Sequence, residues 1–243
     1  MSVVINYVSK YMALIATDTR ITWGKYGEFG YTDGNEKLID LHNMGWAAGA
    51  GLSSFLDLFK NKLSEEDITD TDRIKDIFEE IYNEEVCQYP ELQNEIRQSV
   101  ASASWLGMTN NDIFLRVGIF SKNIDDTIGF LLNDRFYLFY PRNYLDDLVL
   151  IKNFEENNDL DFTYDYMNPS SFQQLIQKVF IMFKQISETS DGVSNNCDIG
   201  IIYLSREGVQ KLKASFNISS FDEETGNLSI QFQQSNTTSF KEE

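Results

Sequence analysis

Two neighbouring stretches decide how this chain is expected to fold: Met1-Ser2-Val3-Val4-Ile5-Asn6-Tyr7, and Tyr11-Met12-Ala13-Leu14-Ile15-Ala16 followed by Thr17-Asp18-Thr19-Arg20. The first is rich in Val and Ile and the second begins as an almost wholly apolar run, so both predict β-strands. The short polar stretch between them is enough for a turn, which makes the pair a hairpin. Ser2 and Asp18 then lie at the same end of that hairpin, and the rest of the chain can be read as their scaffold.

Ser2 is expected to become the first residue of the mature chain, because an initiator methionine is normally removed before so small a side chain. A hydroxyl and a free α-amine would then share one residue. The unperturbed pKa of an α-amine is about 7.7–8.0, so it can act as a general base near neutral pH. A nucleophile with its own base is a known arrangement for acyl transfer. Many chains begin Met-Ser, so the surrounding residues must carry the assignment.

The composition indicates a globular protein and argues against nucleic acid or a membrane as its main partner. The chain has 243 residues, of which 42% are hydrophobic and 14% aromatic, so a sizeable core can form. The formal net charge is −18, which argues against nucleic acid or an anionic membrane as a main partner, since both require basic patches. The sequence shows no signal-peptide pattern and no apolar run of membrane-spanning length, so we expect a cytoplasmic protein.

Cysteine and histidine are too scarce for the commonest metal and triad sites. Cys87 and Cys197 belong to no Cys-x-x-Cys pair, and His42 is the single histidine, placed in a polar turn. A Cys/His zinc site and a Ser-His-Asp triad are therefore disfavoured. We expect no cofactor and no metal.

The rest of the chain alternates in blocks of strands and helices. Helices are predicted at 52–60 (with Ser53 or Ser54 as its cap), 70–85, 91–98 and 170–187, and strands at 37–41, 45–51, 100–108, 113–117, 128–132, 135–140, 199–204, 209–214 and 228–232. The pair 128–132 and 135–140 resembles a hairpin. Blocks of this kind indicate an α+β fold in which two mainly antiparallel sheets pack face to face with helices outside.

We expect one domain over residues 1–243, because the sequence has no internal repeat and no linker-like segment rich in Pro or Ser. Residues 141–168 are acidic and are interpreted as an irregular insertion. Residues 215–243 are interpreted as a polar C-terminal extension.

The order of these features resembles the proteasome β-subunit family of N-terminal nucleophile hydrolases. The matching features are the first strand, Ala16-Thr17-Asp18-Thr19-Arg20, Lys37-Leu38-Ile39, Gly45-Trp46-Ala47-Ala48-Gly49, and Asp191-Gly192-Val193-Ser194 before a strand. The most specific match is Asp18, which is the seventeenth residue counted from Ser2, the place of the family's aspartate. The resemblance is good over residues 2–60, fair over 170–214, and limited to pattern between them. It implies a four-layer αββα sandwich.

The resemblance also implies roles for three charged or nucleophilic residues. Ser2 would be the nucleophile, in place of the family's threonine, and its α-amine would accept the proton. Lys37 would stabilise the developing alkoxide as a cation and keep the amine neutral. Asp18 would hold Lys37 charged and oriented. Taken singly, Asp18, Arg20 and Lys37 could equally form an ion-pair network at the hairpin ends, with Arg20 structural.

Three further residues would complete such a site. The backbone N–H of Gly49 would point into the oxyanion position, where one donor lowers the barrier by about 3–4 kcal/mol. Asp191 and Ser194 keep the family's spacing and would hydrogen-bond around the free amine. The run Gly45 to Gly51 could equally be small because a helix packs closely against it.

The sequence departs from the family pattern in several places. Serine lacks the β-methyl group that restricts threonine, so Ser2 would be less firmly oriented. The loop between Asp18 and Lys37 is about three residues longer than usual, Asn195-Asn196 replaces two glycines, and no residue is identified as the family's middle helper serine. Only Met1 precedes Ser2, as in the simpler bacterial proteasome-like peptidases.

The leading functional hypothesis is a proteasome-like hydrolase that cleaves amide bonds of peptide or protein substrates through Ser2. Such proteins assemble into homo-oligomeric rings or helical arrays, and an unfoldase partner would be unidentified. One alternative is a catalytically silent assembly or binding protein, which the serine substitution and the missing helper favour. Another is a small-amide hydrolase or acyl transferase of the same superfamily, which a pocket too tight for an extended peptide would favour.

Overall fold

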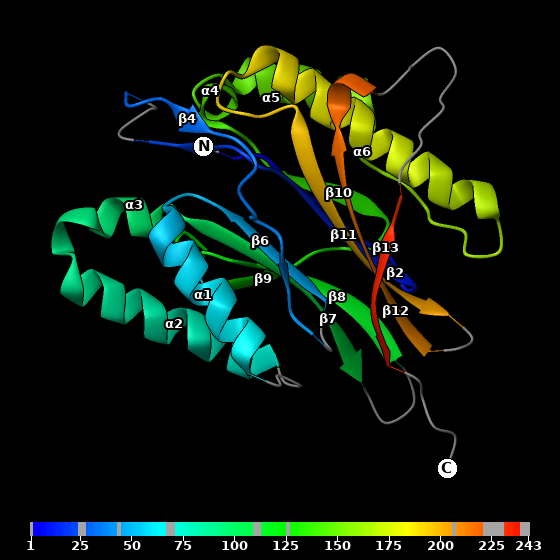
Figure 1. Ribbon diagram of the computed structural model, residues 1–243, viewed down its shortest axis with the longest axis horizontal. Helices are drawn as coiled ribbons and strands as arrows, with labels where there is room; N and C mark the ends of the chain where they lie inside the picture. Colours follow the sequence, from blue (N-terminus) through cyan, green and yellow to red (C-terminus); the bar gives the residue numbers. More distant parts are fainter. Residues whose placement is uncertain are drawn as a thin grey trace.

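The computed structural model contains two large antiparallel sheets that lie face to face between two groups of helices (Figure 1), and a separate two-stranded sheet of β3 (Ile21–Thr22) and β4 (Tyr31–Thr32). It describes residues 2–23, 28–42, 45–66, 71–108, 113–124, 127–205, 208–220 and 231–238. The first sheet has the strand order β10 (Arg135–Phe139), β1 (Val4–Val8), β2 (Met12–Asp18), β11 (Asn196–Ser205), β12 (Gly208–Asn217) and β13 (Gln233–Thr238). The second has the order β5 (Ile39–Asp40), β6 (Trp46–Ala50), β7 (Val100–Met108), β8 (Ile113–Phe120) and β9 (Ile128–Phe130).

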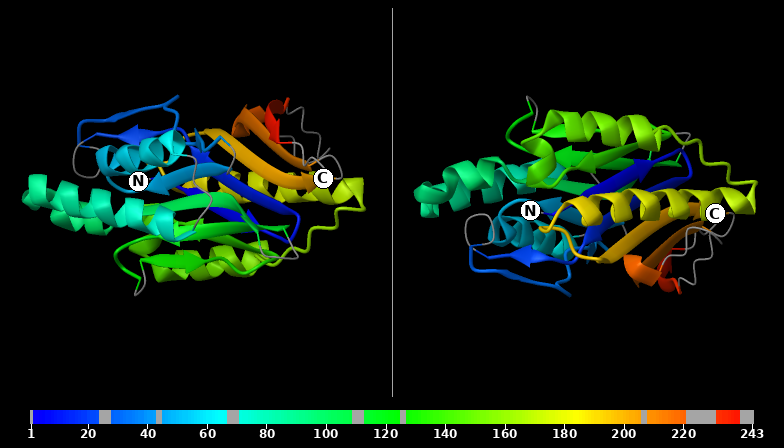
Figure 2. Two further views of the ribbon diagram at one scale, coloured as in Figure 1. Left: turned by 90° about the horizontal axis from the view of Figure 1, so that it is seen from below. Right: turned by 90° about the horizontal axis from the view of Figure 1, so that it is seen from above.

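Helices cover the outer face of each sheet (Figure 1), and Figure 2 shows the molecule from below and from above. The second sheet is covered by α1 (Ser53–Glu65), α2 (Thr71–Gln88), η2 (Pro90–Leu92) and α3 (Gln93–Arg97). The first is covered by α4 (Arg142–Leu145), α5 (Leu148–Asn158) and α6 (Pro169–Thr189). The predicted four-layer αββα sandwich is therefore confirmed. Within the described ranges, no helix is both long and apolar enough to cross a membrane.

The β1–β2 hairpin forms as predicted and lies in the middle of the first sheet. Its register pairs Val4 with Thr17 and Val8 with Ala13, and every residue of both strands is buried. Burial on both sides explains the nearly continuous apolar run, because helices cover one face of these strands and the second sheet covers the other. The same register places Val3 beside Asp18 at the open end of the hairpin.

Close packing between the sheets depends on a large ring fitted against a glycine. Trp46 of β6 is 1% exposed, and its indole Nε1 donates a hydrogen bond of 3.1 Å to the carbonyl of Ile201 in β11. A Cβ atom on Gly200 would lie 2.4 Å from Cγ of Trp46. The glycine therefore creates the space that the indole fills, and the ring fixes how one sheet lies on the other.

The predicted hairpin of residues 128–132 and 135–140 is wrong. β9 pairs with β8 in the second sheet, whereas β10 pairs with β1 in the first. The chain crosses between the sheets over residues 131–134: the Leu131 N–H donates to Val117 of β8, and the Asp134 N–H donates to Val8 of β1. Two apolar strands with a short polar connection look alike in sequence whether they pair with each other or with separate neighbours.

Three smaller expectations also need correction. The segment 141–168 is irregular only in part: residues 142–158 form α4 and α5, with Phe154 in the core over the first sheet, whereas residues 159–168 form no helix and no named strand. Helix α1 is not capped by Ser53 or Ser54, because Leu52 occupies the N-cap position and no side chain caps it. The strand expected at 228–232 lies mostly outside the described residues, and β13 begins at Gln233.

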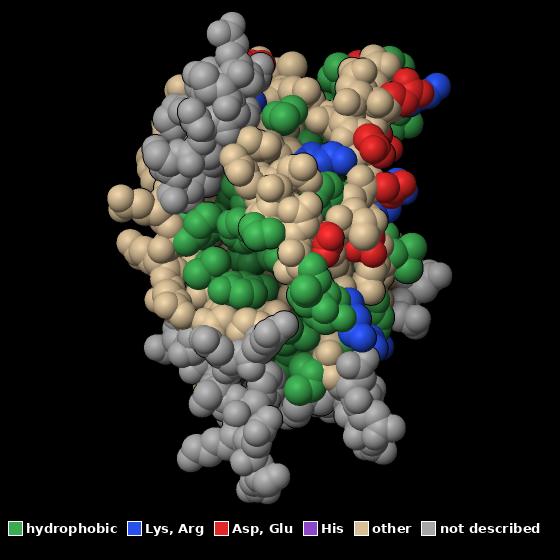
Figure 3. Space-filling model, turned by 90° about the vertical axis from the view of Figure 1, so that its right-hand side faces the viewer, with side chains coloured by type: hydrophobic (Ala, Val, Ile, Leu, Met, Phe, Trp, Pro, Cys, Tyr) green, Lys and Arg blue, Asp and Glu red, His purple; other side chains and the backbone are tan. Residues whose placement is uncertain are grey.

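One end of the molecule, where α6 begins, carries an area of hydrophobic side chains (Figure 3). Tyr166 and Met167, which precede α6, are 56% and 65% exposed, and the ring of Tyr166 packs on Tyr11 with centroids 4.5 Å apart. A second exposed apolar group lies at the α4–α5 connection, where Leu145, Leu148 and Val149 are 53%, 74% and 63% exposed.

Candidate active site

The open end of the β1–β2 hairpin brings Asp18 and Ser2 together. Asp18 is the last residue of β2 and is fully buried. Its carboxylate accepts hydrogen bonds from the backbone N–H groups of Val3 (3.1 Å) and Arg20 (2.9 Å). Ser2, half-buried, is the residue just before Val3. Two backbone N–H groups therefore fix the carboxylate, independently of any cation.

Lys37 reaches this carboxylate from the other sheet. It lies in the segment leading into β5, where its neighbour Leu38 is fully buried between the sheets. The Lys37 ammonium Nζ lies 3.1 Å from each oxygen of Asp18 and donates a hydrogen bond of 2.6 Å to Oγ of Ser2. Ser2, Asp18 and Lys37 thus meet where the ends of the two sheets adjoin, and the predicted trio is close together.

Burial acts on both charged members of this trio. Desolvation raises the pKa of Asp18 and lowers the pKa of Lys37, while each charge stabilises the other and opposes those shifts. Lys37 therefore loses its proton more readily than an exposed lysine does. Its proton faces the Ser2 hydroxyl, which is the position where negative charge would develop if that oxygen attacked a substrate.

Gly49 lies in β6, near the end of the second sheet that carries Lys37. If the register of β5 with β6 is continued two residues past the strand, Lys37 falls opposite Gly49. A Cβ atom at Gly49 would lie 2.8 Å from Cδ2 of Leu56 in α1 and 2.9 Å from the carbonyl oxygen of Val100. Close packing therefore requires a glycine at this position, independently of any role of its N–H group.

Ser194 contacts Thr19 rather than Ser2. Its fully buried Oγ is 3.1 Å from Oγ1 of Thr19, accepts a hydrogen bond of 3.3 Å from the Thr19 N–H, and donates one of 2.7 Å to the Asn196 carbonyl. The Asn196 carbonyl also accepts from the Thr19 N–H, at 3.2 Å. Asn196, which replaces a family glycine, therefore helps hold the 194–196 turn against the end of β2.

Asp191 is joined to the site through Arg20. The Arg20 guanidinium makes two hydrogen bonds to the Asp33 carboxylate, at 2.7 and 2.9 Å, and a third of 2.5 Å to the backbone carbonyl of Asp191. It also lies over the ring of Tyr31, 3.9 Å from the centroid. Among the described residues, the Asp191 carboxylate has no hydrogen-bond partner. Arg20 therefore joins the loops that carry Asp33 and Asp191 beside Asp18.

The turn before α4 contains Tyr140 and Pro141. Asn143, within α4, donates to the carbonyl of Thr189 (2.9 Å) and accepts from the hydroxyl of Ser190 (2.7 Å). This side chain ties the start of α4 to the end of α6, directly before Asp191.

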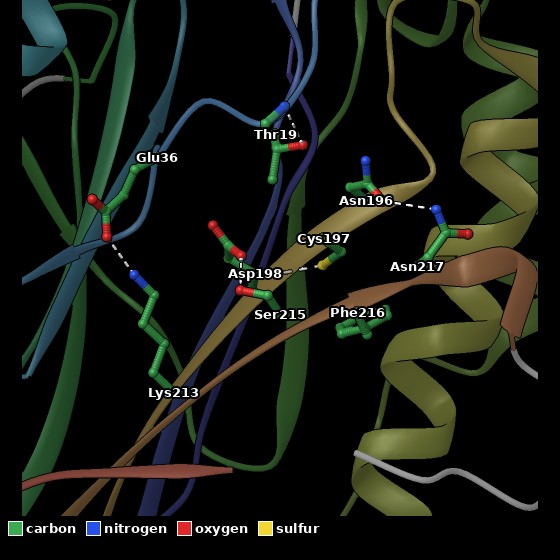
Figure 4. Close-up of a pocket in the computed structure, with 10 residues that line it drawn as sticks. Thr19, Glu36, Asn196, Cys197, Asp198, Lys213, Ser215, Phe216 and Asn217 are labelled. Carbon is green, nitrogen blue, oxygen red and sulfur yellow. Dashed lines mark hydrogen bonds and ion pairs between the residues drawn. The ribbon is translucent and has the colours of Figure 1, made fainter. Parts of the chain in front are cut away.

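A pocket of about 500 Å³ is lined by Thr19 and Glu36, the sequence neighbours of Asp18 and Lys37, but by no member of the trio itself (Figure 4). Thr19, Gly34 and Glu36 line one part of it and residues of β11 and β12 line the rest. Its polar side chains are paired with one another: Glu36 with Lys213, Asp198 with Ser215, and Asn196 with Asn217. The Cys197 thiol is fully buried here, and burial raises its pKa well above the ordinary value, so it is poorly suited to act as a nucleophile.

No group of three or more His, Cys, Asp or Glu side chains suited to a metal ion occurs in the part of the chain that the structure describes. The groups that meet at the site are the Ser2 hydroxyl, the Lys37 ammonium and the Asp18 carboxylate. Thr19, Asp33, Asn143 and the buried Lys60 of α1 take part in fixing the site, and the sequence pattern singled out none of them.

The two sheets and the helices outside them define a four-layer αββα fold, which the chain shares with solved proteasome-like Anbu structures. Comparison with solved structures identifies Anbu chains as similar. A Gly-1 mutant of Anbu from Hyphomicrobium sp. strain MC1 matches with a TM-score of 0.60 and 12% identity, over 92% of this chain and 90% of that one. Anbu (ancestral beta-subunit) from Yersinia bercovieri matches with a TM-score of 0.55 and 12% identity, over 83% and 81%.

A further Anbu structure from Hyphomicrobium sp. strain MC1 has a TM-score of 0.57 and 13% identity, over 91% of this chain and 89% of that one. No model of a protein family matches the sequence, and no curated protein matches it. At such low identity the structural likeness establishes the fold alone, and it confirms the resemblance to the proteasome β-subunit family at that level.

Proposed function

We propose that the protein is a hydrolase of amide bonds, with peptides as substrates and Ser2 as the nucleophile once Met1 has been removed. The observation that carries this proposal is the short contact between the Lys37 ammonium and the Ser2 hydroxyl, 2.6 Å, made while the same ammonium lies 3.1 Å from both Asp18 oxygens. A buried cation held by a carboxylate and directed at a hydroxyl is suited to stabilise an alkoxide.

In the proposed reaction, the α-amine of Ser2 takes the hydroxyl proton while Oγ bonds to the substrate carbonyl carbon. The backbone N–H of Gly49 stabilises the resulting oxyanion. The tetrahedral intermediate then breaks at its C–N bond, and the leaving nitrogen takes the proton from the amine. An ester between Ser2 and the acyl group remains.

Water completes the cycle. It gives a proton to the same amine and attacks the ester carbonyl, after which the C–Oγ bond breaks and Oγ recovers its proton. Lys37 remains an ammonium throughout, because its charge stabilises Oγ in both tetrahedral intermediates. Asp18 fixes that ammonium, and Arg20 and Thr19 hold the neighbouring loops.

We also propose that the chain assembles with copies of itself. Exposed aliphatic side chains on soluble chains often mark contacts, and Leu145, Leu148 and Val149 form such a group at the α4–α5 connection. The Anbu structures support a proteasome-like subunit architecture, in which assembly would bury helix faces.

A silent assembly protein is the second candidate, and a specific observation favours it. The hydroxyl of Ser194 is engaged by Thr19 and Asn196, and no residue is identified as the family's helper serine. Two of the groups expected to surround the amine would then serve other contacts or be absent.

The deciding experiment combines intact mass and N-terminal sequencing of the native protein, before and after treatment with an electrophilic probe for N-terminal nucleophiles. We expect loss of Met1 and a single adduct on Ser2. Ser2→Ala should abolish labelling, and Lys37→Ala should slow it about 10²–10³-fold, the usual cost of losing one preorganised electrostatic contact.

Ser187→Ala is the matched control, because its hydroxyl donates to the carbonyl of Lys184 within α6, away from the trio, and it should label like the wild type. Retention of Met1, or a free Ser2 that the probe does not label, would contradict the hydrolase and favour the silent protein.

A further inference from the structure

Lys60 is a second lysine buried beside the site. It lies in α1 and is 3% exposed, although lysine is rarely buried without a partner. Its ammonium donates a hydrogen bond of 3.1 Å to the backbone carbonyl of Lys37. It also lies 2.8 Å from the carboxylate of Asp57, one turn earlier, whose side chain is 55% exposed. The cation is thus inside the protein while its counter-ion is largely in solvent.

The position of Lys60 matters because Lys37 lies outside regular structure. β5 comprises only Ile39 and Asp40, so no strand ladder fixes the Lys37 peptide. From the β12 side, Lys213 pairs with Glu36 and Lys211 pairs with Asp40. From the helix side, Lys60 binds the Lys37 carbonyl itself. The segment that carries Lys37 is therefore held between β12 and α1.

The geometry points to Lys60 as a positioning residue for Lys37: we propose that it fixes the Lys37 peptide and presents a second buried cation to the ammonium that faces Ser2. This proposal rests on the proposed function in one respect, namely that Lys37 acts on Ser2 during catalysis. The contact between the two lysines stands on the structure, so the two ideas can fail separately.

Charged groups from three directions face Lys37. Asp18 of β2 and Asp33 of the preceding loop raise its pKa, while Lys60 of α1 lowers it and acts in the same direction as burial. Because the Lys60 charge lowers the pKa of Lys37, Lys37 loses its proton at a lower pH than it would without Lys60. Removal of the Lys60 charge should therefore move that loss to higher pH.

The test is a pH titration of Lys37 by NMR in protein with ¹³C-labelled lysine side chains, with the Lys37 signal assigned from Lys37→Arg. In Lys60→Met the midpoint of the Lys37 titration should move to higher pH. Lys60→Arg, which keeps the cation, should return it close to the wild-type midpoint. Lys178→Met is the matched control: it removes another lysine that bonds a backbone carbonyl, that of Asp161 at 3.0 Å, but from α6 over the first sheet, and it should leave the Lys37 midpoint in place.

Labelling of Ser2 by the electrophilic probe gives a second readout. Lys60→Met should slow labelling about tenfold, because the peptide that carries Lys37 loses its anchor. Lys60→Gln keeps a donor for the Lys37 carbonyl without the charge, so it should shift the titration and retain more of the labelling rate. It also serves if Lys60→Met does not fold.

The outcomes separate the two proposals. A folded Lys60→Met or Lys60→Gln protein in which Lys37 titrates at the wild-type pH would overturn the role of Lys60, whether or not Ser2 reacts. A wild-type protein whose Ser2 is never labelled would overturn the hydrolase, while a shifted Lys37 titration in the same samples would still support Lys60.

Discussion

At the scale of single residues, the site depends on one buried ion pair. Asp18 is fully buried and Lys37 is 8% exposed, so both charges have been removed from water. Such pairs contribute little net stability, because desolvation offsets the attraction between the charges. Their arrangement here is better explained by the hydroxyl they face, since the ammonium uses one of its three protons on Ser2.

Replacing one member of this ion pair should destabilise the protein far more than replacing both. Lys37→Met should lower the free energy of unfolding by about 3–5 kcal/mol, because Asp18 would remain as an uncompensated buried charge. Asp18→Asn should be similarly costly. The double variant should recover part of the loss, since neither charge remains, and urea unfolding of all four proteins measures it. Strictly additive effects would contradict a direct coupling of the two side chains.

The residues of the site were predictable to the extent that their chemistry follows from position along the chain. Ser2, Asp18 and Lys37 could be grouped because the hairpin and the offset between the first two place them at one end. Ser194 could not be assigned its contact, because Thr19 is 175 residues away and nothing local indicates the pairing. Nothing in the sequence indicates that Lys60 is buried, since a lysine on a helix ordinarily lies on the solvated face.

At the scale of elements, the contact between the sheets is set by Trp46 against Gly200. Gly200→Ala should lower the free energy of unfolding by about 1–3 kcal/mol, because the new methyl group would lie 2.4 Å from the indole and must displace it. Thermal or urea unfolding measures the change. Gly129→Ala in β9 is the control: its nearest atom would be Cδ1 of Ile124 at 3.6 Å, an ordinary contact, so its stability should change little.

A Gly200→Ala protein as stable as Gly129→Ala would contradict the proposed fit of ring and glycine. Trp46→Leu introduced together with Gly200→Ala gives a further check. The smaller side chain leaves room for the methyl group, so the effect of Gly200→Ala should be smaller in that background than in the wild type.

The elements were easier to predict than their partners. The β1–β2 hairpin and α6 follow from strong local patterns of apolar residues. β9 and β10 also follow as strands, but their assignment to different sheets depends on which neighbours they meet, β8 and β1, and alternation along one strand carries no such information. The helices within residues 141–158 were hidden by the acidic composition of that segment.

At the scale of the whole molecule, proposed self-assembly can be tested at the α4–α5 connection. Leu148 is 74% exposed and lies beside Val149. Leu148→Asp should lower the mass of the assembly, because a charge would have to be buried between copies. Sedimentation velocity and light scattering measure that mass at matched protein concentration.

Lys152→Asn is the control for this variant, since it changes the net charge by the same amount on the same helix, and its assembly should be unaffected. An unchanged assembly in Leu148→Asp would exclude this surface as the contact, and a wild-type protein that sediments as a single chain would contradict self-assembly altogether.

The site draws its groups from both halves of the sandwich: Ser2 and Asp18 belong to the first sheet, and Lys37 leads into the second. The contact between the Ser2 hydroxyl and the Lys37 ammonium therefore depends on how the two sheets pack on each other. An apolar layer that contains Ile15 and Trp46 lies between them. A slip of about 1 Å between them can cost a reaction about a hundredfold in rate. Reactivity of Ser2 should consequently be lost before the fold is, and a chain that is still fully folded can already be chemically inert.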